Sequence, residues 1–401
     1  MERRPKNMSG QDESELREKQ SLDDFLLISS TPRSNRNQAN RKYFNESYTT
    51  INITNESSID RNFSESRSNE SNSNADKLHN VDQLFNRIIS AKHRKNAILE
   101  ICKCINNDNN NMLNVGYFIF KRPSVAAALL SEIFEHYQYD KSVPLSPTSF
   151  EIIGSIIVIF QQVIIHGEYR YDLFNSRLLT YLLPYFNVNG QASDVEHLRV
   201  SLLGLYATMS SKFTLDDMED FFSSSYGQHP HDTNNEEGTT NRIDVSDRFS
   251  LEDLFTHTLN GLSQGTSEVC KHMALILLSR LLGLQQQRAR LHTNDSLFNQ
   301  VISNLTHITG YISRRITPEV QTESMRQIRS FNRSEQTIFI QTKKLLQFVI
   351  DCFNQLITDQ VLCHKSRGLL PAELRSNHFV ELFLQDQDVQ AWLETLWRLL
   401  R

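Results

Sequence analysis

The stretch EHLRVSLLGLYA, from Glu196 to Ala207, sorts its side chains into two faces when it is placed on a helix. One face is apolar and is formed by Leu198, Leu202 and Leu205. The other face mixes a titratable ring, a small hydroxyl group and a glycine; it is formed by His197, Val200, Ser201 and Gly204. A glycine inside a helix costs about 1 kcal/mol relative to alanine, and close approach of a neighbouring helix or a bound peptide usually offsets this cost. The second face therefore has two open interpretations, helix packing and peptide binding.

Helical patterns like this one recur from Val81 to the end of the chain, and no run alternates as a strand does. Several of the helices are hydrophobic on most sides and short turns separate them, which is typical of stacked helical repeats. We therefore predict an all-α fold, an armadillo-repeat right-handed solenoid. At ~40 to 47 residues per repeat, the ordered part would hold about six or seven repeats.

Polar segments divide the chain. Residues 1–78 are rich in Ser, Asn, Arg and Glu and poor in aromatic side chains, so they bury too little apolar surface to offset chain entropy. We predict a disordered tail over 1–78 and an armadillo-repeat domain over 79–401. Two polar insertions are expected within that domain, at about 223–248 and 313–336.

Two helix starts can be predicted from capping residues. Ser124 precedes VAAALLSEIFEHY and is the expected N-cap of that helix, and Thr214 is the expected N-cap of the next acidic helix, LDDMEDFF. The acids of the second helix fall in its first turn, where the helix dipole favours negative charge.

The run IIGSIIVIFQQVII, from Ile152 to Ile165, is the most hydrophobic in the chain. It falls short of the ~20 residues that span a bilayer, and Gln161 and Gln162 interrupt it. We therefore predict a helix buried inside the protein and no membrane partner. The polar amino terminus lacks the hydrophobic region of a secretory signal, and five scattered cysteines fit a reducing compartment.

No catalytic or metal-binding pattern is found. The sequence has no Gly-rich phosphate loop, no HExxH and no GxSxG. His229 and His231 lie in a polar loop without further ligands at metal-site spacing, and Cys102 and Cys104 project in different directions from one helix. The net charge of -5 gives no bulk electrostatic case for nucleic acid. We expect a protein that is not an enzyme and that needs no cofactor or metal.

The order and spacing of several blocks carry a resemblance to a known family. The blocks are AAALLSEI from Ala126, EHLRVSLLGLYA from Glu196, SEVCKHMALILLSRLL from Ser267, LLQFVIDCFNQLITDQVLCHKSRGLLPAEL from Leu345 and HFVELFLQDQDVQAWLETLWRLL from His378. From Val81 to Arg401 the chain resembles the required-for-cell-differentiation family, the armadillo-repeat subunit of the CCR-NOT deadenylase complex. This chain is a divergent example.

The resemblance implies a non-catalytic adaptor. Members bind the Not scaffold of the complex and repressor proteins with short linear motifs, so that messenger RNA is deadenylated, decays and is repressed at translation or transcription. The expected locations are the cytoplasm, including P-bodies, and the nucleus. Carried over by motif, the peptide groove would be formed by His197, Val200, Ser201, Gly204, His272 and Met273. The scaffold-binding positions would be Lys121, Pro123 and Ala127.

Some family positions carry other residues here. Lys121 and Pro123 stand where a histidine and an aromatic residue are usual, so scaffold binding is expected in an altered form. Asn294 and Ser296 replace an aromatic and an arginine of the family's tryptophan-accepting pocket. DQVLC from Asp359 replaces a basic turn, so the resemblance gives little support for direct RNA binding.

Two other classes of protein stay open. An armadillo receptor for cargo or signalling peptides could act outside the CCR-NOT complex, although its usual ladder of asparagines and tryptophans along the groove is missing. A helical enzyme with an unrecognised site is the other alternative. An acid, base or nucleophile cluster on a concave face would favour it.

Overall fold

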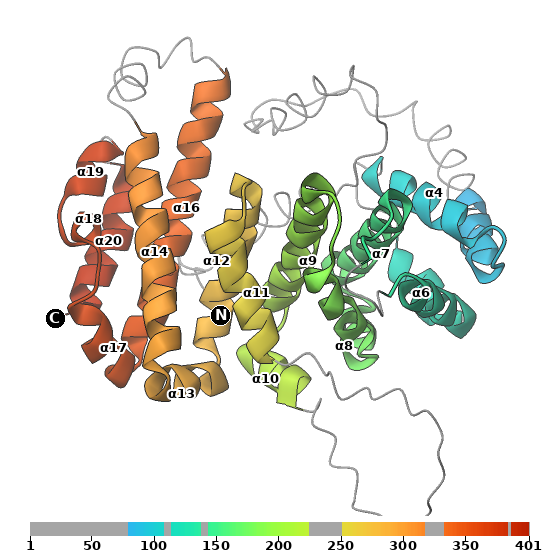
Figure 1. Cartoon of the computed structure of the whole chain (residues 1–401), viewed down its shortest axis with the longest axis horizontal. Helices are drawn as coiled ribbons and strands as arrows, with labels where there is room; N and C mark the ends of the chain where they lie inside the picture. Colours follow the sequence, from blue (N-terminus) through green and yellow to red (C-terminus); the bar gives the residue numbers. More distant parts are fainter. Residues whose placement is uncertain are drawn as a thin grey trace, which may run out of the picture. The chain divides into compact units, whose positions relative to one another are not determined.

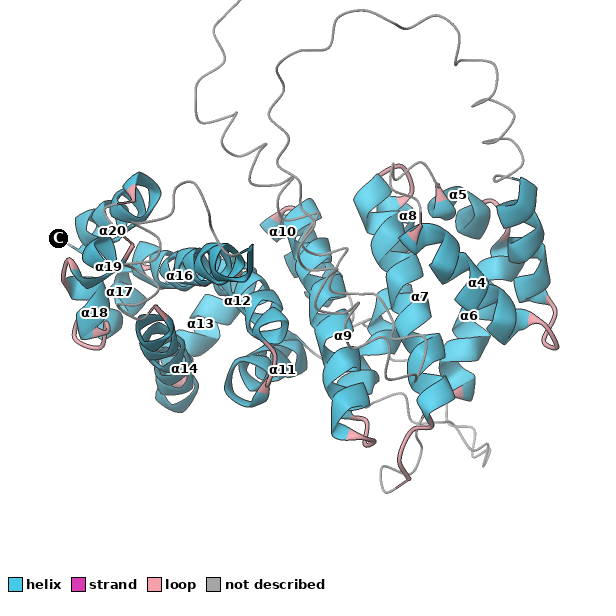
Figure 2. Cartoon of the chain, turned by 90° about the horizontal axis from the view of Figure 1, so that it is seen from above, coloured by secondary structure: helices cyan, strands magenta, loops and turns pink. Residues whose placement is uncertain are grey.

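The computed structural model describes residues 79–107, 114–137, 143–223, 251–316, 333–383 and 386–400. These segments are helices and connecting turns, and none of the described residues is in a strand (Figures 1 and 2). The predicted all-α class is therefore confirmed for the described part of the chain. The predicted tail at 1–78 lies outside the described residues, as do 224–248 and 317–332 of the two expected insertions.

The chain divides into two compact units between Lys212 and Phe213. The predicted domain bounds of 79–401 stay a prediction. The first unit contains a helix at 79–89 and then α4 (Arg94–Asn106), α5 (Val115–Phe120), α6 (Pro123–Glu135), α7 (Pro147–His166), α8 (Arg170–Asn175), the 3-10 helix η2 (Leu178–Asn187) and α9 (Ala192–Lys212). The second contains α10 (Leu215–Ser223), α11 (Leu251–Gln264), α12 (Glu268–Gly283), α13 (Gln285–Thr293), α14 (Asp295–Arg315), α16 (Arg333–Thr358), α17 (Gln360–Arg367), α18 (Ala372–Arg375), α19 (His378–Leu382) and α20 (Gln387–Leu400).

The centre of the first unit is α7, which packs against α4, α5 and α9. Its side chains from Ile152 to Ile164 are buried, as its strongly apolar sequence predicts. The Ser146 side chain caps the amino end, and Gly167 ends the helix with φ 84, a left-handed conformation that glycine adopts at little cost. By length and composition α7 could cross a membrane, but 83% of its apolar window is buried inside the fold, which favours the predicted core helix.

The second unit is built around α12 and α16, which pack against each other. α16 also contacts α14, α17 and α20, and α12 contacts α11 and α13 (Figures 1 and 2). The predicted cap at the start of α10 is confirmed: Thr214 Oγ1 accepts from the backbone N–H of Asp217 at 3.1 Å, while Asp217 Oδ2 accepts from the backbone N–H of Thr214 at 3.0 Å. This reciprocal pair satisfies two donors that a helix start leaves open.

Two helices extend into the second expected insertion. α14 continues to Arg315 and α16 begins at Arg333, so residues 313–315 and 333–336 are helical. Ile312 and Ile316 are buried, and this apolar pair holds the last turn of α14 although polar residues lie between them.

Long helices pack in sequence order within each unit. α7 contacts both α4 and α9, and α16 contacts both α12 and α20. Stacked helical repeats bury their apolar faces in this way. The armadillo type and the right-handed twist of the solenoid stay predictions.

Candidate functional site

The three predicted scaffold-binding residues are exposed at the start of α6. Lys121 ends α5, Pro123 is the first residue of α6, and Ala127 follows one turn later on the same side of the helix. The prediction that Ser124 caps this helix is wrong. Arg122 stands at the N-cap without a side-chain cap, because the fixed φ of Pro123 suits the first helical position.

The exposed side of α6 extends beyond these residues. Ser131 is exposed one turn after Ala127, and Phe134 is 40% exposed near the end of the helix. The Phe134 ring lies edge-on to Tyr181 of η2, with ring centroids 5.2 Å apart. We call the exposed residues Lys121, Pro123, Ala127, Ser131 and Phe134 the α6 face. Ser131 lies four residues after Ala127 and Phe134 three residues after Ser131, so helical spacing could have predicted both from the sequence.

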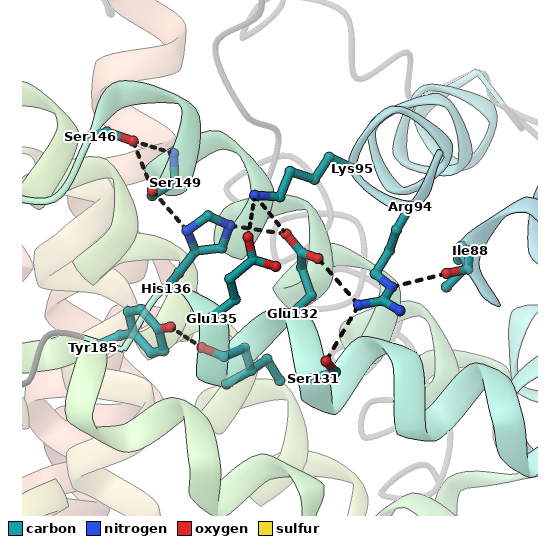
Figure 3. Close-up of polar contacts among 11 residues, drawn as sticks. Ile88, Arg94, Lys95, Ser131, Glu132, Glu135, His136, Ser146, Ser149 and Tyr185 are labelled. Atoms are coloured by element: carbon teal, nitrogen blue, oxygen red, sulfur yellow. Dashed lines mark hydrogen bonds and ion pairs between the residues drawn. The ribbon is translucent and has the colours of Figure 1, made fainter. Parts of the chain in front are cut away.

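A buried carboxylate lies next to this face. The Glu132 side chain is only 1% exposed and is surrounded by three basic groups (Figure 3). His136 Nε2 lies 3.0 Å from its Oε1, Lys95 Nζ lies 3.6 Å from the same oxygen, and Arg94 Nη1 lies 3.8 Å from Oε2. The lone acid on the apolar side of AAALLSEI is the sequence signal for such a cluster, because an unpaired charge is costly to bury. The sequence alone does not show its partners.

Two of these basic groups also reach the surface. Lys95 Nζ donates to Glu135 Oε1 at 2.7 Å, and this hydrogen bond raises the pKa of Lys95 and lowers that of Glu135. Arg94 Nη1 donates to the Ser131 hydroxyl at 3.3 Å, so the same guanidinium touches buried Glu132 and a residue of the α6 face. These contacts of Arg94 and Lys95 connect α4 to α6 and fix the orientation of the exposed side of α6.

The cluster continues to the start of α7. The Ser149 hydroxyl lies 2.9 Å from His136 Nδ1 and 2.7 Å from the Ser146 hydroxyl (Figure 3). Ser149, His136 and Glu132 thus lie in the order of a serine, histidine and acid relay. Ser149 is buried, at 7% exposure, and its hydroxyl lies between His136 and Ser146. A substrate carbonyl has no approach to that oxygen, so the arrangement suits structure better than nucleophilic catalysis.

The four predicted groove residues of α9 share one side of the helix, since they are three and four positions apart. His197 is half-buried, whereas Val200, Ser201 and Gly204 are buried. The Ser201 hydroxyl donates to the His197 carbonyl at 3.0 Å, and the Thr208 hydroxyl donates to the Gly204 carbonyl at 2.7 Å. Helix packing therefore accounts for much of the odd composition of this side.

The other two predicted groove residues, His272 and Met273, are buried in α12 of the second unit. His272 Nε2 lies 3.0 Å from the Gln341 carbonyl of α16, and its Nδ1 lies 3.0 Å from the Glu268 carbonyl. Burial lowers the pKa of His272 to about 4, although both carbonyls favour the charged ring. The ring is therefore neutral near pH 7 and links α12 to α16. A groove built from both units stays a prediction.

The departures from the family pattern have local structural roles. Asn294 caps α14, accepting from the backbone N–H of Leu297 at 2.9 Å. Asp359 caps α17 and lies 2.8 Å from His292 Nε2, and its pKa is lowered because the backbone N–H of Leu362 and the His292 ring outweigh the effect of burial. Among the described residues, no group of three or more His, Cys, Asp and Glu side chains could hold a metal ion.

The α6 face and the four predicted groove residues of α9 lie within one continuous sequence match. Residues 84–222 match the model of the cell differentiation family, Rcd1-like. This Rcd1-like match covers about a third of the chain, from the helix at 79–89 to α10, and it confirms the resemblance for that segment. The likeness noted in the blocks after residue 222 stays an interpretation of the sequence. No curated protein matches the chain.

Proposed function

We propose that this chain is a non-catalytic adaptor of the CCR-NOT complex that binds the Not scaffold through the α6 face. The Rcd1-like match includes all of this face and supports the family function at this level. The scaffold and its deadenylases would degrade messenger RNAs that other proteins select. This would take place in the cytoplasm, P-bodies and nucleus.

The observation that carries the proposal is the exposure of Ala127 in the middle of the α6 face. Its small side chain lets the backbone of a partner helix approach α6 closely, and half-exposed Phe134 offers an apolar anchor one to two turns away. Lys121 places a positive charge beside them. The partner surface should therefore be helical and apolar, with an acid facing Lys121.

Repressor peptides would bind on α9, in the groove that the resemblance implies. His197 is the half-buried member of the set and is the contact that the side chains on α9 support best. Val200, Ser201 and Gly204 are buried, so a peptide could reach them only after a local rearrangement.

Affinity purification from the protein's own cells tests the proposal. Three tagged forms are compared by mass spectrometry: wild type, Ala127→Tyr and Ala391→Tyr. Ala391 is an exposed alanine on α20 and serves as the matched control. We expect the Not scaffold and deadenylases with wild type and with Ala391→Tyr, and their loss from Ala127→Tyr. If the scaffold is missing from all three folded forms, the proposal fails and a receptor for peptides outside the complex takes its place.

A further inference from the structure

A chain of hydrogen bonds leads from the surface at Ser146 to the buried Glu132 carboxylate (Figure 3). The Ser146 and Ser149 hydroxyls are 2.7 Å apart, Ser149 Oγ lies 2.9 Å from His136 Nδ1, and His136 Nε2 lies 3.0 Å from Glu132 Oε1. The hydrogen bonds can all be donated inward, from Ser146 to Ser149, from Ser149 to Nδ1, and from Nε2–H to Glu132. The state of the Ser146 hydroxyl thus bears on the hydrogen bonds that reach a buried carboxylate.

Ser146 combines two features of a modification site. Its side chain is exposed, and Pro147 follows it directly. Its backbone is extended, with φ -69 and ψ 151, and Val143 and Pro144 are exposed outside any helix. Leu145, directly before Ser146, is buried, and its backbone N–H donates to the Asn189 carbonyl at 2.8 Å. A protein kinase that requires proline after the acceptor serine would therefore meet an exposed serine in a segment that is anchored at Leu145.

We propose that Ser146 is phosphorylated by a proline-directed protein kinase and that the phosphate reverses this hydrogen-bond chain. In the modification step, the bond between the γ-phosphorus of ATP and the oxygen that bridges to ADP breaks. A phosphorus–oxygen bond forms at Ser146 Oγ, ADP leaves, and the hydroxyl proton passes to a base of the kinase.

Phosphorylation removes the inward donor at Ser146 and supplies oxygens that only accept, with a charge of about -1.5 to -2. The Ser149 hydroxyl then turns to donate to the phosphate, which leaves its lone pairs facing His136 Nδ1. His136 therefore loses the hydrogen bond that Ser149 donated to its Nδ1, while its Nε2 still contacts Glu132 Oε1.

The first test is phosphorylation of the purified full-length chain by a proline-directed kinase with ATP, with sites located by peptide mass spectrometry. The control is Pro147→Ala, which keeps Ser146 and its cap while it removes the kinase motif. We expect phosphate at Ser146 in wild type and at least about tenfold less in the control. Phosphate only at other Ser-Pro or Thr-Pro sites, or on Thr148 in place of Ser146, would overturn the proposal.

The second test follows the His136 ring nitrogens by 15N NMR at neutral pH in the same phosphorylated protein. We expect the Nδ1 signal of His136 to move on phosphorylation, because the ring loses the hydrogen bond from Ser149. In Ser149→Ala that hydrogen bond is already missing, so phosphorylation should leave the Nδ1 signal in place. If the Nδ1 signal of wild type does not move, the reversal is wrong even where Ser146 carries phosphate. Neither test depends on scaffold binding, so the proposed function can fail or stand separately.

Discussion

Glu132 is held by Arg94 and Lys95 of another helix and by His136, the C-cap residue of its own helix. Arg94 and Lys95 belong to α4, about 40 positions earlier in the chain, and the Ser146 and Ser149 hydroxyls complete the environment of His136 from α7. Such a cluster exists only after the helices pack. The isolated glutamate in an apolar pattern is a sequence signal of it, but its partners cannot be predicted from spacing along one helix.

We predict that Glu132→Gln destabilises the first unit by about 2–4 kcal/mol, because Arg94 and His136 lose a buried counter-charge while the shape of the side chain is kept. Glu135→Gln is the matched control. Its side chain is 53% exposed, so losing its pair with Lys95 should cost less than about 1 kcal/mol. Hydrogen exchange of α6 amides measures both changes. Equal effects of the two substitutions would show that Glu132 has no special role.

We predict that the second unit loses stability as the pH falls from about 6.5 toward 4. The pKa of His272 is about 4 in the fold and near 6.5 in the unfolded chain, so between these values the unfolded state binds more protons. Stability therefore rises with pH across this window, and the loss from pH 7 to pH 5 attributable to His272 is about 2 kcal/mol.

Tryptophan fluorescence in urea measures this loss, because both tryptophans of the chain, Trp392 and Trp397, lie in α20 of the second unit. His272→Gln keeps a donor for the Gln341 carbonyl but cannot take up a proton. The wild type should lose about 2 kcal/mol more than this variant over the same pH interval. The same slope in both proteins would assign the pH dependence to other groups.

At the scale of helices, the sequence predicts which segments are helical better than it predicts where each helix ends. The burial of α7 follows from its strongly apolar pattern, and the start of α10 follows from Thr214 and its partner three residues later. By contrast, nothing local predicts that α8 ends near Arg177, which has φ 60, or that Leu178–Asn187 forms a 3-10 helix. Tertiary packing decides such breaks, and it also outweighs the capping preference of Ser124.

Replacing two helical glycines by alanine should change the stability of the first unit in opposite directions. A Cβ at Gly116 of α5 would lie 2.8 Å from Cβ of Tyr169 and 3.0 Å from its Cδ2, so Gly116→Ala must displace the Tyr169 ring from its stack on Phe120. We expect a loss of about 1–3 kcal/mol. Gly154 of α7 has no heavy atom within 4 Å of the added Cβ, so Gly154→Ala should gain about 0.5–1 kcal/mol from lower chain entropy.

Both glycines lie in the first unit, so hydrogen exchange of α7 amides reports the two variants on one scale. The expected result is faster exchange in Gly116→Ala and slower exchange in Gly154→Ala. Destabilisation by both would mean that α7 is packed too tightly at Gly154 for even a methyl group.

At the scale of the whole molecule, the sequence correctly predicts the all-α fold of the described residues. The family likeness predicted from Val81 to Arg401 is confirmed over residues 84–222. The division into two units between Lys212 and Phe213 was not predicted, since the hydrophobic patterns continue on both sides of that point. The candidate site is partly predictable. Positions on one helix, such as Pro123 and Ala127, can be grouped by their spacing. The six-residue groove combines residues from both units, and the sequence cannot show whether these residues form one surface.

The α6 face is the element on which the adaptor role depends. A tyrosine at Ala127 adds a large side chain where a partner helix must approach closely, so we predict that Ala127→Tyr weakens scaffold binding about 100-fold or more. Ala391→Tyr adds the same side chain at an exposed alanine of α20 and should bind like wild type.

The most direct measurement is a calorimetric titration of the purified chain with the purified central domain of the Not scaffold, for wild type, Ala127→Tyr and Ala391→Tyr. The account predicts a tight, saturable complex for wild type and Ala391→Tyr, and at least about 100-fold weaker binding for Ala127→Tyr with its helical content unchanged. No binding by folded wild type, or equal binding by all three proteins, would contradict it.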